Sequence, residues 1–530
     1  MGDSADMLVL SPERMKAYDN YAIRTWGIPS AVLMENAGRS TYRLLKEAYL
    51  GPARRLALVC GRGNNGGDGF VIARYALRDG FETRVLLVAD PEGLTGDARL
   101  NMDLYRSMGG AVTIVADDVS EATEAIRRCD VIVDALFGTG LAKDVGGVER
   151  AVIGEVNRSG KPVISVDIPS GLDGLNGLPK GDAVRATHTY TYGHPKLGQM
   201  LYPGVTYRGR LTVVDISLPA ACEAALGFDA RLVDGDMVRR LFRARPPEAH
   251  KGMFGNLAVV AGSAGKTGAA AMASMAALRI GAGLVTLVIP GSLNSIVASK
   301  LTEAMTYPVE DQGRGVFLLS SFREVREFAA ERDVVILGPG LGREEETMAL
   351  VRRLFEELDK PFVIDADGIN AFVGHLELLD HAQGKVVLTP HPGEFGRLVG
   401  RSAPEVNGDR LNMGRRFAKE HRVNLVLKGV PTITFSPDGE AFINPTGNPA
   451  LAKGGTGDIL TGFVGGLACQ GYTLTEAGLF AVYLHGYIAD TWAGQYTDMD
   501  MVAGDLIPGV GAAIRDIRHG TDRVYIEKSL

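Results

Sequence analysis

The sequence has little of what secreted, disulfide-bonded or nucleic-acid-binding proteins need. Its four cysteines are scattered, with no Cys-x-x-Cys pair and no histidine at metal-ligand spacing. We therefore expect buried free thiols in a reducing compartment, and neither disulfides nor a zinc site. A net charge of −7 lacks the basic surplus that non-specific nucleic-acid binding requires. The first residues lack a basic segment followed by an apolar one, so no signal peptide is predicted.

Long uninterrupted apolar runs are also missing. The two most apolar stretches, 267–278 and 461–490, are rich in small residues and are limited or interrupted by Arg279, Gln470 and Glu476. Buried helices explain such stretches better than membrane spans, which need about 20 consecutive apolar residues. The sequence therefore predicts a cytoplasmic protein with no membrane and no nucleic acid among its partners.

Glycine is abundant, at 68 of the 530 residues, and 46% of the residues are hydrophobic. This composition suits an α/β protein with many tight turns between strands and helices. Apolar strands alternate with helical stretches from Arg55 onward, which predicts a mostly parallel sheet. The alternation weakens at 219–221 and 243–247, where we place a linker, and begins again at Asn256. We predict two α/β domains, 1–225 and 226–530.

Polar residues follow successive strands of the first domain. Strand 55–60 runs into a glycine-rich turn, 61–69, and we expect a helix to start at Phe70. Asn64 and Asn65 in this turn offer oxygens to a cation or donors to a phosphate. Because ligands bind at the carboxyl ends of parallel strands, we expect this turn and two further strand-end loops to share one site. A set made of Asn65, Asp134 and Ser170 suits a monovalent cation better than zinc.

In the second domain the stretch 453–458, Lys-Gly-Gly-Thr-Gly-Asp, runs straight into an apolar helix. Glycines before a helix let backbone amides converge on an anion, and the helix terminus adds partial positive charge. Asp458 beside such a site suggests a proton-transferring base and phosphoryl chemistry. The alternative is an ordinary turn in which Asp458 caps the helix. Other strand ends carry Gly338–Gly342, His391 with Glu394, and Lys428–Thr432.

These motifs together resemble the bifunctional NAD(P)H-hydrate repair enzymes, in which an epimerase domain is fused to an ADP- or ATP-dependent dehydratase domain. In the first domain the resemblance rests on Asn64–Gly69, Asp134–Leu141 and Val166–Gly171. In the second it rests on His250–Gly252, Gly338–Gly342, His391–Glu394 and Gly454–Asp458. The resemblance implies an N-terminal Rossmann-like three-layer sandwich and a C-terminal ribokinase-like α/β domain.

The resemblance also implies roles for particular residues. In the epimerase domain, Asp167 would contact the reacting ring, K⁺ would be held by Asn65, Asp134 and Ser170, and the substrate would be bound by Asn64, Asn65, Gly66, Gly67, Asp68, Gly138, Thr139, Gly140, Leu141, Ala142, Lys143 and Asp144. In the dehydratase domain, Asp458 would be the catalytic base, the hydrate would also contact Ala269, Gly342 and His391, and the nucleotide would be bound by Lys428, Gly429, Val430, Pro431, Thr432 and Gly457.

The implied activities are epimerisation of the R- and S-hydrates of NADH and NADPH, and dehydration of the S-hydrate through a phosphorylated intermediate. The implied cofactors are K⁺ in the first domain and Mg²⁺ in the second, with ADP or ATP as co-substrate. We also expect a homo-oligomer. Two alternatives remain: a vitamin or sugar kinase, which would stop at a stable phosphorylated product, and a first domain that only presents ligand.

Overall fold

The computed structural model describes residues 6–529. Its contacts divide the chain into two compact units: Met7–Arg231 with the C-terminal segment from Tyr525, and Leu232–Val524 with Asp6. We call these the first and the second unit. All four cysteines are free and buried, as the sequence predicts. Within 6–529 no helix combines the length and apolar character that a membrane span needs.

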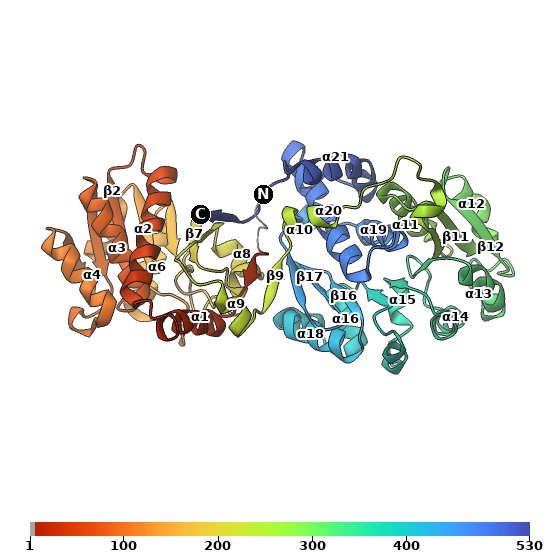
Figure 1. Cartoon of the computed structure of the whole chain (residues 1–530), viewed down its shortest axis with the longest axis horizontal. Coiled ribbons are helices and arrows are strands. Elements are labelled where there is room, and N and C mark those ends of the chain that lie inside the picture. Colours follow the sequence, from red (N-terminus) through yellow and green to blue (C-terminus); the bar gives the residue numbers. More distant parts are fainter. Residues whose placement is uncertain (1–5, 530) are drawn as a thin grey trace. The chain divides into compact units, whose positions relative to one another are not determined.

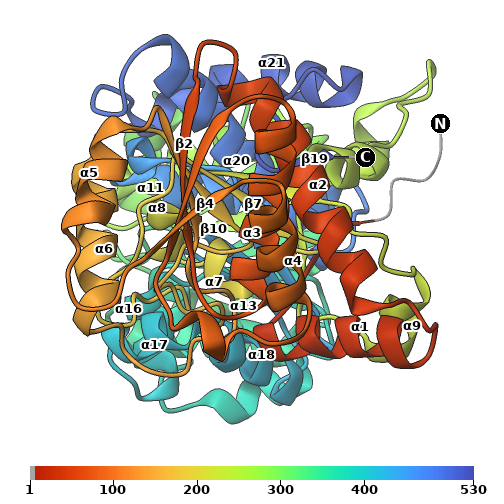
Figure 2. The same ribbon diagram turned by 90° about the vertical axis from the view of Figure 1, so that its left-hand side faces the viewer.

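The first unit is built on an eight-stranded parallel sheet in the order β19-β8-β7-β6-β5-β2-β3-β4. Its strands are β2 (Arg55–Cys60), β3 (Glu82–Leu87), β4 (Ala111–Ile114), β5 (Val131–Ala135), β6 (Val163–Val166), β7 (His188–Tyr192), β8 (Arg210–Val214) and β19 (Glu527–Ser529). Helices α2 (Ser30–Tyr49), α3 (Asn64–Arg78) and α4 (Gly96–Ser107) cover one face, and α5 (Ser120–Arg128) and α6 (Gly147–Arg158) the other (Figure 2).

Both faces of this sheet are apolar, which is why its strands are continuous hydrophobic runs rather than alternating ones. One core cluster joins α2, α3 and α4 to the sheet through residues such as Leu58, Phe70 and Tyr105. The opposite cluster includes Ile132 and Ile153 from the side of α5 and α6. The predicted α/β class and the three-layer arrangement are confirmed.

The second unit contains a mainly parallel sheet with strands in the order β18-β17-β16-β15-β14-β13-β10-β11-β12. The strands are β10 (Asn256–Val260), β11 (Leu284–Pro290), β12 (Met305–Val309), β13 (Val334–Leu337), β14 (Phe362–Ile364), β15 (Val386–Leu388), β16 (Asn424–Leu427), β17 (Thr432–Phe435) and β18 (Ala441–Asn444). Only the pairs β16·β17 and β17·β18 of this series are antiparallel.

Helices lie on both faces of the second sheet (Figure 1). One face carries α11 (Thr267–Ile280), α19 (Thr456–Cys469) and α20 (Leu474–Gln495), and the other α13 (Phe322–Ala330), α14 (Glu345–Glu357), α16 (Pro392–Val399) and α18 (Arg410–Glu420). Helix α21 (Leu506–His519) follows α20. The small-residue stretches form buried helices, as predicted, because Gly462 and Gly466 of α19 lie against the backbone of α11, where a Cβ would meet a carbonyl oxygen at 2.3 or 2.6 Å.

Two local expectations were wrong. The segment predicted as a linker contains α9 (Ala221–Leu226), β9 (Ala230–Leu232) and α10 (Gly235–Leu241). Cys222 and Leu232 are buried, so packing holds these short elements in place. Their apolar sequence pattern is too short to have predicted them. The helix expected from Phe70 instead starts at Asn64, so the asparagines and glycines of the turn form the first turns of α3.

The C-terminal strand β19 returns to the first unit and forms the edge of its sheet, parallel to β8. Glu527 accepts a hydrogen bond from the Thr212 hydroxyl at 3.0 Å and pairs with Arg210 at 2.5 Å. Because the second unit occupies the intervening sequence, the first unit is completed only by the chain's last residues.

We expect removal of residues 525–530 to lower the stability of the first unit by about 1–3 kcal/mol, since a few ladder hydrogen bonds are each worth roughly 1 kcal/mol. Scanning calorimetry should show the transition of the first unit shifting down while that of the second unit stays. Val524→Ala is the control, because that side chain is 70% exposed. An unchanged first transition would contradict the assignment of β19.

Candidate active sites

Three oxygen-bearing side chains from different strand ends meet in the first unit. Asp134 ends β5, and its carboxylate accepts hydrogen bonds from the Ser170 hydroxyl at 2.5 Å, the Ser170 amide at 2.9 Å and the Ser165 hydroxyl at 2.7 Å. Asn65, in the first turn of α3, donates its side-chain amide to the Phe137 carbonyl at 3.0 Å. The Phe137 amide donates to Ser170 Oγ at 2.8 Å. The structure thus brings Asn65, Asp134 and Ser170 together.

The electrostatics of this cluster favour a cation. Asp134 is 1% exposed, and burial raises the pKa of its carboxyl group. Its hydrogen-bond donors are hydroxyl and amide groups, and within 6–529 no lysine, arginine or histidine forms an ion pair with it. The Oδ1 atom of Asn65 is buried without a hydrogen-bond partner in the described chain. An unpaired buried acceptor beside a buried carboxylate is costly unless a ligand satisfies both.

Asp167, directly after β6, adopts a left-handed backbone conformation with φ of 63°. Several contacts hold it there. Its amide donates to the Tyr190 carbonyl at 2.8 Å, and its carbonyl accepts from Gln199 Nε2 at 2.6 Å. Its Oδ1 accepts from the Tyr192 amide at 3.0 Å and from the ammonium group of Lys196. Strained residues fixed this firmly cluster at functional sites.

Sequence reasoning missed Lys196 and Gln199. Both follow β7, whose pattern His-Thr-Tyr-Thr-Tyr is rich in β-branched and aromatic residues and could have been recognised as a strand. Recognising it would have placed the loop 193–196 at the same sheet edge as Asp134 and Asp167. The buried lysine was therefore detectable as one more strand-end residue.

Two more carboxyl groups belong to this site. Asp68 of α3 is buried, and burial, followed by the charges of Asp167 and Asp19, holds its pKa well above the usual value. Asp19, from α1 (Pro12–Arg24), has its pKa raised to about 6, mainly by burial and also by Asp167, whereas Lys196 lowers it. The site therefore contains two carboxyl groups that keep their proton to higher pH than an exposed aspartate does.

The start of α3 is close-packed, and this explains its glycines. A Cβ on Gly66 would lie 2.0 Å from the Gly61 carbonyl oxygen, and one on Gly67 2.6 Å from Met34 Cε. The N-cap is Gly63, which offers no side-chain hydrogen bond to the first turn. The predicted loop 138–144 begins beside it, since a Cβ on Gly138 would lie 3.3 Å from Asn65 Cβ. The predicted residues 64–68 and Gly138 are thus neighbours.

The second unit places Asp458 in the first turn of α19. The N-cap of this helix is Gly455, with φ of 96° and no side-chain hydrogen bond to the first turn, so the capping alternative for Asp458 does not hold. Within 6–529 the Asp458 carboxyl group has no hydrogen-bond partner. Burial and the nearby charges of Asp365, Asp367 and Glu394 raise its pKa to about 7, although Lys428 lowers it. A carboxyl group with this pKa is suited to general-base work.

Lys428, at the end of β16, lies opposite the N-terminus of α19. Its Nζ donates to Asp365 Oδ1 at 2.9 Å and lies 4.0 Å from Glu394 Oε2. The other oxygen of Asp365 accepts from the Thr461 hydroxyl of α19 at 2.6 Å. A Cβ on Gly457 would lie 3.4 Å from Lys428 Nζ, so glycine keeps the space beside the ammonium group open.

His391 and Gly342 approach the same carboxylate cluster. His391 caps α16, since its Nδ1 accepts from the Gly393 and Glu394 amides at 3.0 and 3.3 Å, and burial lowers its pKa. The Gly342 amide donates to Asp367 Oδ2 at 3.0 Å. Ala269 lies against the same loop, where a Cβ on Gly340 would be 3.2 Å from Ala269 Cβ.

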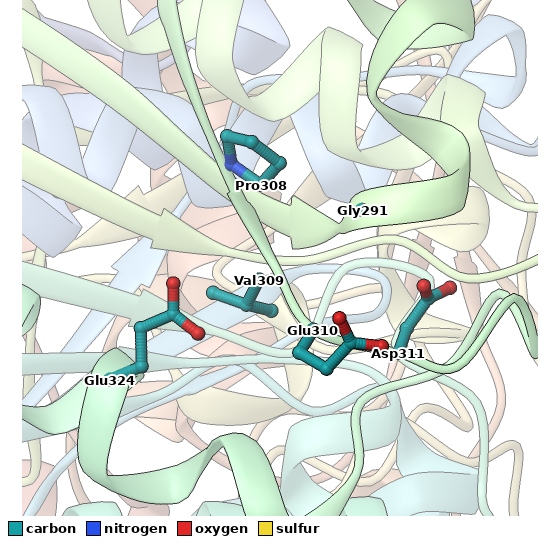
Figure 3. Close-up of a pocket in the computed structure, with 6 residues that line it drawn as sticks. All are labelled: Gly291, Pro308, Val309, Glu310, Asp311 and Glu324. Atoms are coloured by element: carbon teal, nitrogen blue, oxygen red, sulfur yellow. The ribbon is translucent and has the colours of Figure 1, made fainter.

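An acidic depression of 380 Å³ lies elsewhere in the second unit, lined by Gly291, Pro308, Val309, Glu310, Asp311 and Glu324 (Figure 3). Asp311 is engaged by the fold, because it accepts hydrogen bonds from the Ser292 hydroxyl and the Gly315 amide. No predicted site residue lines the depression. Its carboxylates therefore add nothing to the two sites above.

Two units with mainly parallel sheets, each with buried carboxyl groups and an uncapped helix N-terminus at the strand ends, define a two-site α/β enzyme. A family model described as YjeF-related protein N-terminus matches residues 30–198. A model described as NAD(P)H-hydrate dehydratase matches residues 257–508.

Curated relatives match along nearly the whole chain. The bifunctional NAD(P)H-hydrate repair enzyme Nnr of Moorella thermoacetica is 39% identical over 522 residues, with 98% of each chain covered. That of Thermofilum pendens is 37% identical, again with 98% of each chain covered. A solved structure, the ADP/ATP-dependent NAD(P)H-hydrate dehydratase from Bacillus subtilis, is 29% identical with a TM-score of 0.47, covering 54% of this chain and 98% of its own. The chain belongs to the bifunctional NAD(P)H-hydrate repair enzymes.

We expect Gly66→Ala to destabilise the first unit by about 1–3 kcal/mol or more, because overpacking forces the start of α3 away from the Gly61 carbonyl. Thermal unfolding should show a lowered first transition. Gly63→Ala is the matched control in the same segment, because a Cβ there meets nothing within 4 Å. Equal stability of the two variants would contradict this account of α3.

Proposed function

We propose that this chain repairs hydrated NADH and NADPH in two reactions, one in each unit. The first unit interconverts the R- and S-hydrates, and the second dehydrates the S-hydrate at the expense of ADP or ATP. The observation that carries the proposal is Asp458, a carboxyl group with a pKa of about 7 and no internal partner, set beside a lysine at an open helix N-terminus. Family membership along the whole chain supports both halves.

The chemistry of the second unit follows from the hydrate. Its hydroxyl group is a poor leaving group, so direct loss of water from the ring is slow. Asp458 takes the hydroxyl proton while the oxygen attacks the terminal phosphoryl group, and the bond from that phosphorus to the shortened nucleotide breaks. The phosphate then leaves with its bonding electrons as C5 loses a proton, which restores the C5–C6 double bond.

Lys428, Gly429, Val430, Pro431, Thr432 and Gly457 would bind the nucleotide, and Ala269, Gly342 and His391 the hydrate. The Lys428 ammonium group and the first amides of α19 attract the phosphates. Among residues 6–529 no group of three or more His, Cys, Asp or Glu could hold a metal ion by itself. This fits Mg²⁺, which usually binds through substrate phosphates with one or two carboxylates and would neutralise the phosphate charge.

In the first unit, Asn65, Asp134 and Ser170 would hold K⁺. The unpaired Oδ1 of Asn65 and the uncompensated carboxylate of Asp134 fit a monovalent cation with neutral and singly charged oxygen ligands. The ion would offset the buried charge and order the start of α3. Residues 64–68 and 138–144 would bind the hydrated NADH or NADPH, and Asp167 would contact its reacting ring.

We also propose a homo-oligomer in the cytoplasm. Apolar side chains, 41–52% accessible, are exposed on α4, at its C-cap and on the edge strand β4: Leu100, Leu104, Met108 and Ile114. An apolar patch on a sheet edge suits association of like subunits. The four free buried cysteines suit a reducing compartment. Light scattering of the full chain measures the oligomeric state.

The test of the function is to incubate NADPH hydrate with the full chain and ADP or ATP, and to follow the return of dihydronicotinamide absorbance and the release of inorganic phosphate. Recovery of both supports repair. A stable phosphorylated hydrate without phosphate release would show a kinase instead. No consumption of hydrate with either nucleotide would reject the proposal.

Asp458→Asn should leave the fold intact and lower the dehydration rate by about 10²–10⁴-fold, the usual cost of losing a general base. The wild-type rate should rise as pH increases through about 7, because Asp458 is protonated and inactive below its raised pKa and ionised above it. The control is Asp359→Asn, since that side chain is 84% exposed. Near wild-type turnover by Asp458→Asn would sink the assignment.

The rate of epimerisation should rise with K⁺ and stay low in Na⁺ alone. Asp134→Asn should weaken this dependence, because it removes the only charge among the proposed ligands. Ser165→Ala is the control: it removes a hydrogen bond to Asp134 but no proposed ligand. ADP-dependent dehydration of the S-hydrate should be unaffected in both variants. Equal epimerase rates in Na⁺ and K⁺ would overturn the cation assignment.

A further inference from the structure

The two carboxylate oxygens of Asp167 have different surroundings. Oδ1 accepts hydrogen bonds from the Lys196 ammonium group, from the Tyr192 amide at 3.0 Å and from the Thr191 hydroxyl at 3.4 Å. Within 6–529, Oδ2 accepts none. The Asp167 side chain is 14% exposed and that of Lys196 is 1% exposed. One oxygen is therefore clamped, while the other is left without a partner.

Lys196 is itself held by several groups. Its Nζ also donates to Thr191 Oγ1 and to the Tyr192 carbonyl, both at 3.0 Å, and its backbone amide donates to Gln199 Oε1 at 2.8 Å. Gln199 in turn donates to the Asp167 carbonyl. Burying a lysine costs free energy, and an ion pair at the surface would form without that cost. The hydrogen bonds of its ammonium group go to Asp167 itself or to residues that hold Asp167.

We propose that Lys196 positions Asp167 for epimerisation by holding Oδ1, so that Oδ2 is the oxygen that acts on the hydrated ring. This inference rests on the proposed function of the first unit. It assigns Lys196 a positioning role, acting through Asp167, rather than contact with the substrate.

The reaction explains why one oriented carboxylate is useful. Inversion at C6 requires the C6–O bond to break: the hydroxyl takes a proton and leaves as water while the N1 lone pair forms an N1–C6 double bond. Water then adds to the opposite face of C6 and returns one proton, so the site ends with the proton count with which it began. An ionised carboxylate stabilises the intermediate cation and accepts the proton of the incoming water.

Neighbouring groups can supply the first proton. The carboxyl groups of Asp68 on α3 and Asp19 on α1 interact electrostatically with Asp167 and Lys196, and burial raises the pKa of both, that of Asp19 to about 6. Tyr192, the last residue of β7, and His194, which follows that strand, are further titratable groups near the pair; burial raises the pKa of Tyr192 and lowers that of His194 to about 4. Lys196 lowers the pKa values of both Asp19 and Asp68.

The experiment compares Lys196→Met with Lys161→Met in the full chain, using R- and S-NADPH hydrate. Lys161 precedes the amino end of β6, whereas Lys196 follows the carboxyl end of β7. We expect Lys196→Met to lower kcat of epimerisation by about 10²-fold, the scale expected for a misplaced catalytic group, with KM little changed. Removing the ammonium group should also move the acid limb of the kcat/KM profile upward, because Lys196 lowers the pKa values of Asp19 and Asp68 in the same site. A structural loss alone would not move that limb.

Two further variants keep the test decisive if Lys196→Met folds poorly. Lys196→Arg keeps the charge and should retain more activity than Lys196→Met. Replacing the pair together, Asp167→Asn with Lys196→Met, leaves no unpaired charge and should be no slower than Asp167→Asn alone. A further tenfold loss in the double variant, or a raised KM at unchanged kcat in Lys196→Met, would overturn the proposal.

The outcome for the wild-type chain separates this inference from the proposed function. If the wild-type chain epimerises the hydrate and Lys196→Met matches it in rate and pH profile, only the role of Lys196 is rejected. If the wild-type chain does not epimerise the hydrate, the proposed function of the first unit fails and the role of Lys196 fails with it.

Discussion

Both sites depend on carboxyl groups that the fold buries with too few cations to neutralise them. Asp134 has only hydroxyl and amide donors, Asp68 is buried beside Asp167 and Asp19, and Asp458 shares Lys428 with Asp365 and Glu394. Water stabilises an ionised carboxylate, whereas the protein interior does not. Each of these groups must therefore be protonated, paired or bound to a ligand. Each of these three states is chemically useful: a protonated group is a proton donor, a paired group is an oriented carboxylate, and a group that needs a ligand forms a cation site.

The sheets decide which carboxyl groups meet. In a parallel sheet every strand ends at the same edge, so polar residues that follow strands converge however far apart they lie in sequence. This is why the sequence was sufficient to group Asn65, Asp134 and Ser170, whereas only the family resemblance implied that Asp458 and Lys428 belong to one site. The same logic failed for Lys196 because β7 was not recognised, and a strand that is not predicted contributes no strand end.

Other features could not be predicted from local pattern. The glycines of 66–69 indicated a turn, yet they lie in a helix. Glycine is needed there because a side chain would clash with Gly61, Met34 or Cys60, and not because of the backbone conformation. Such contacts join residues from separate elements and leave no periodic signal. The return of β19 to β8 is similar: three residues at the end of the chain carry too little pattern to indicate which of two sheets they join.

In the proposed reactions the two units use their carboxyl groups for different chemistry, and the surroundings of these groups explain the difference. Asp458 lies at an uncapped helix N-terminus with Lys428, a setting that attracts phosphate, so its proton transfer can be coupled to phosphoryl transfer. Asp167 has no helix terminus of its own; Lys196 and the Tyr192 amide hold its Oδ1, and the carboxyl groups of Asp68 and Asp19, both with raised pKa values, lie in the same site. That arrangement can stabilise a transient cation and exchange protons without activating the hydroxyl by phosphorylation. A reversible inversion requires nothing more, whereas net removal of water from the hydrate requires the leaving group that a nucleotide provides.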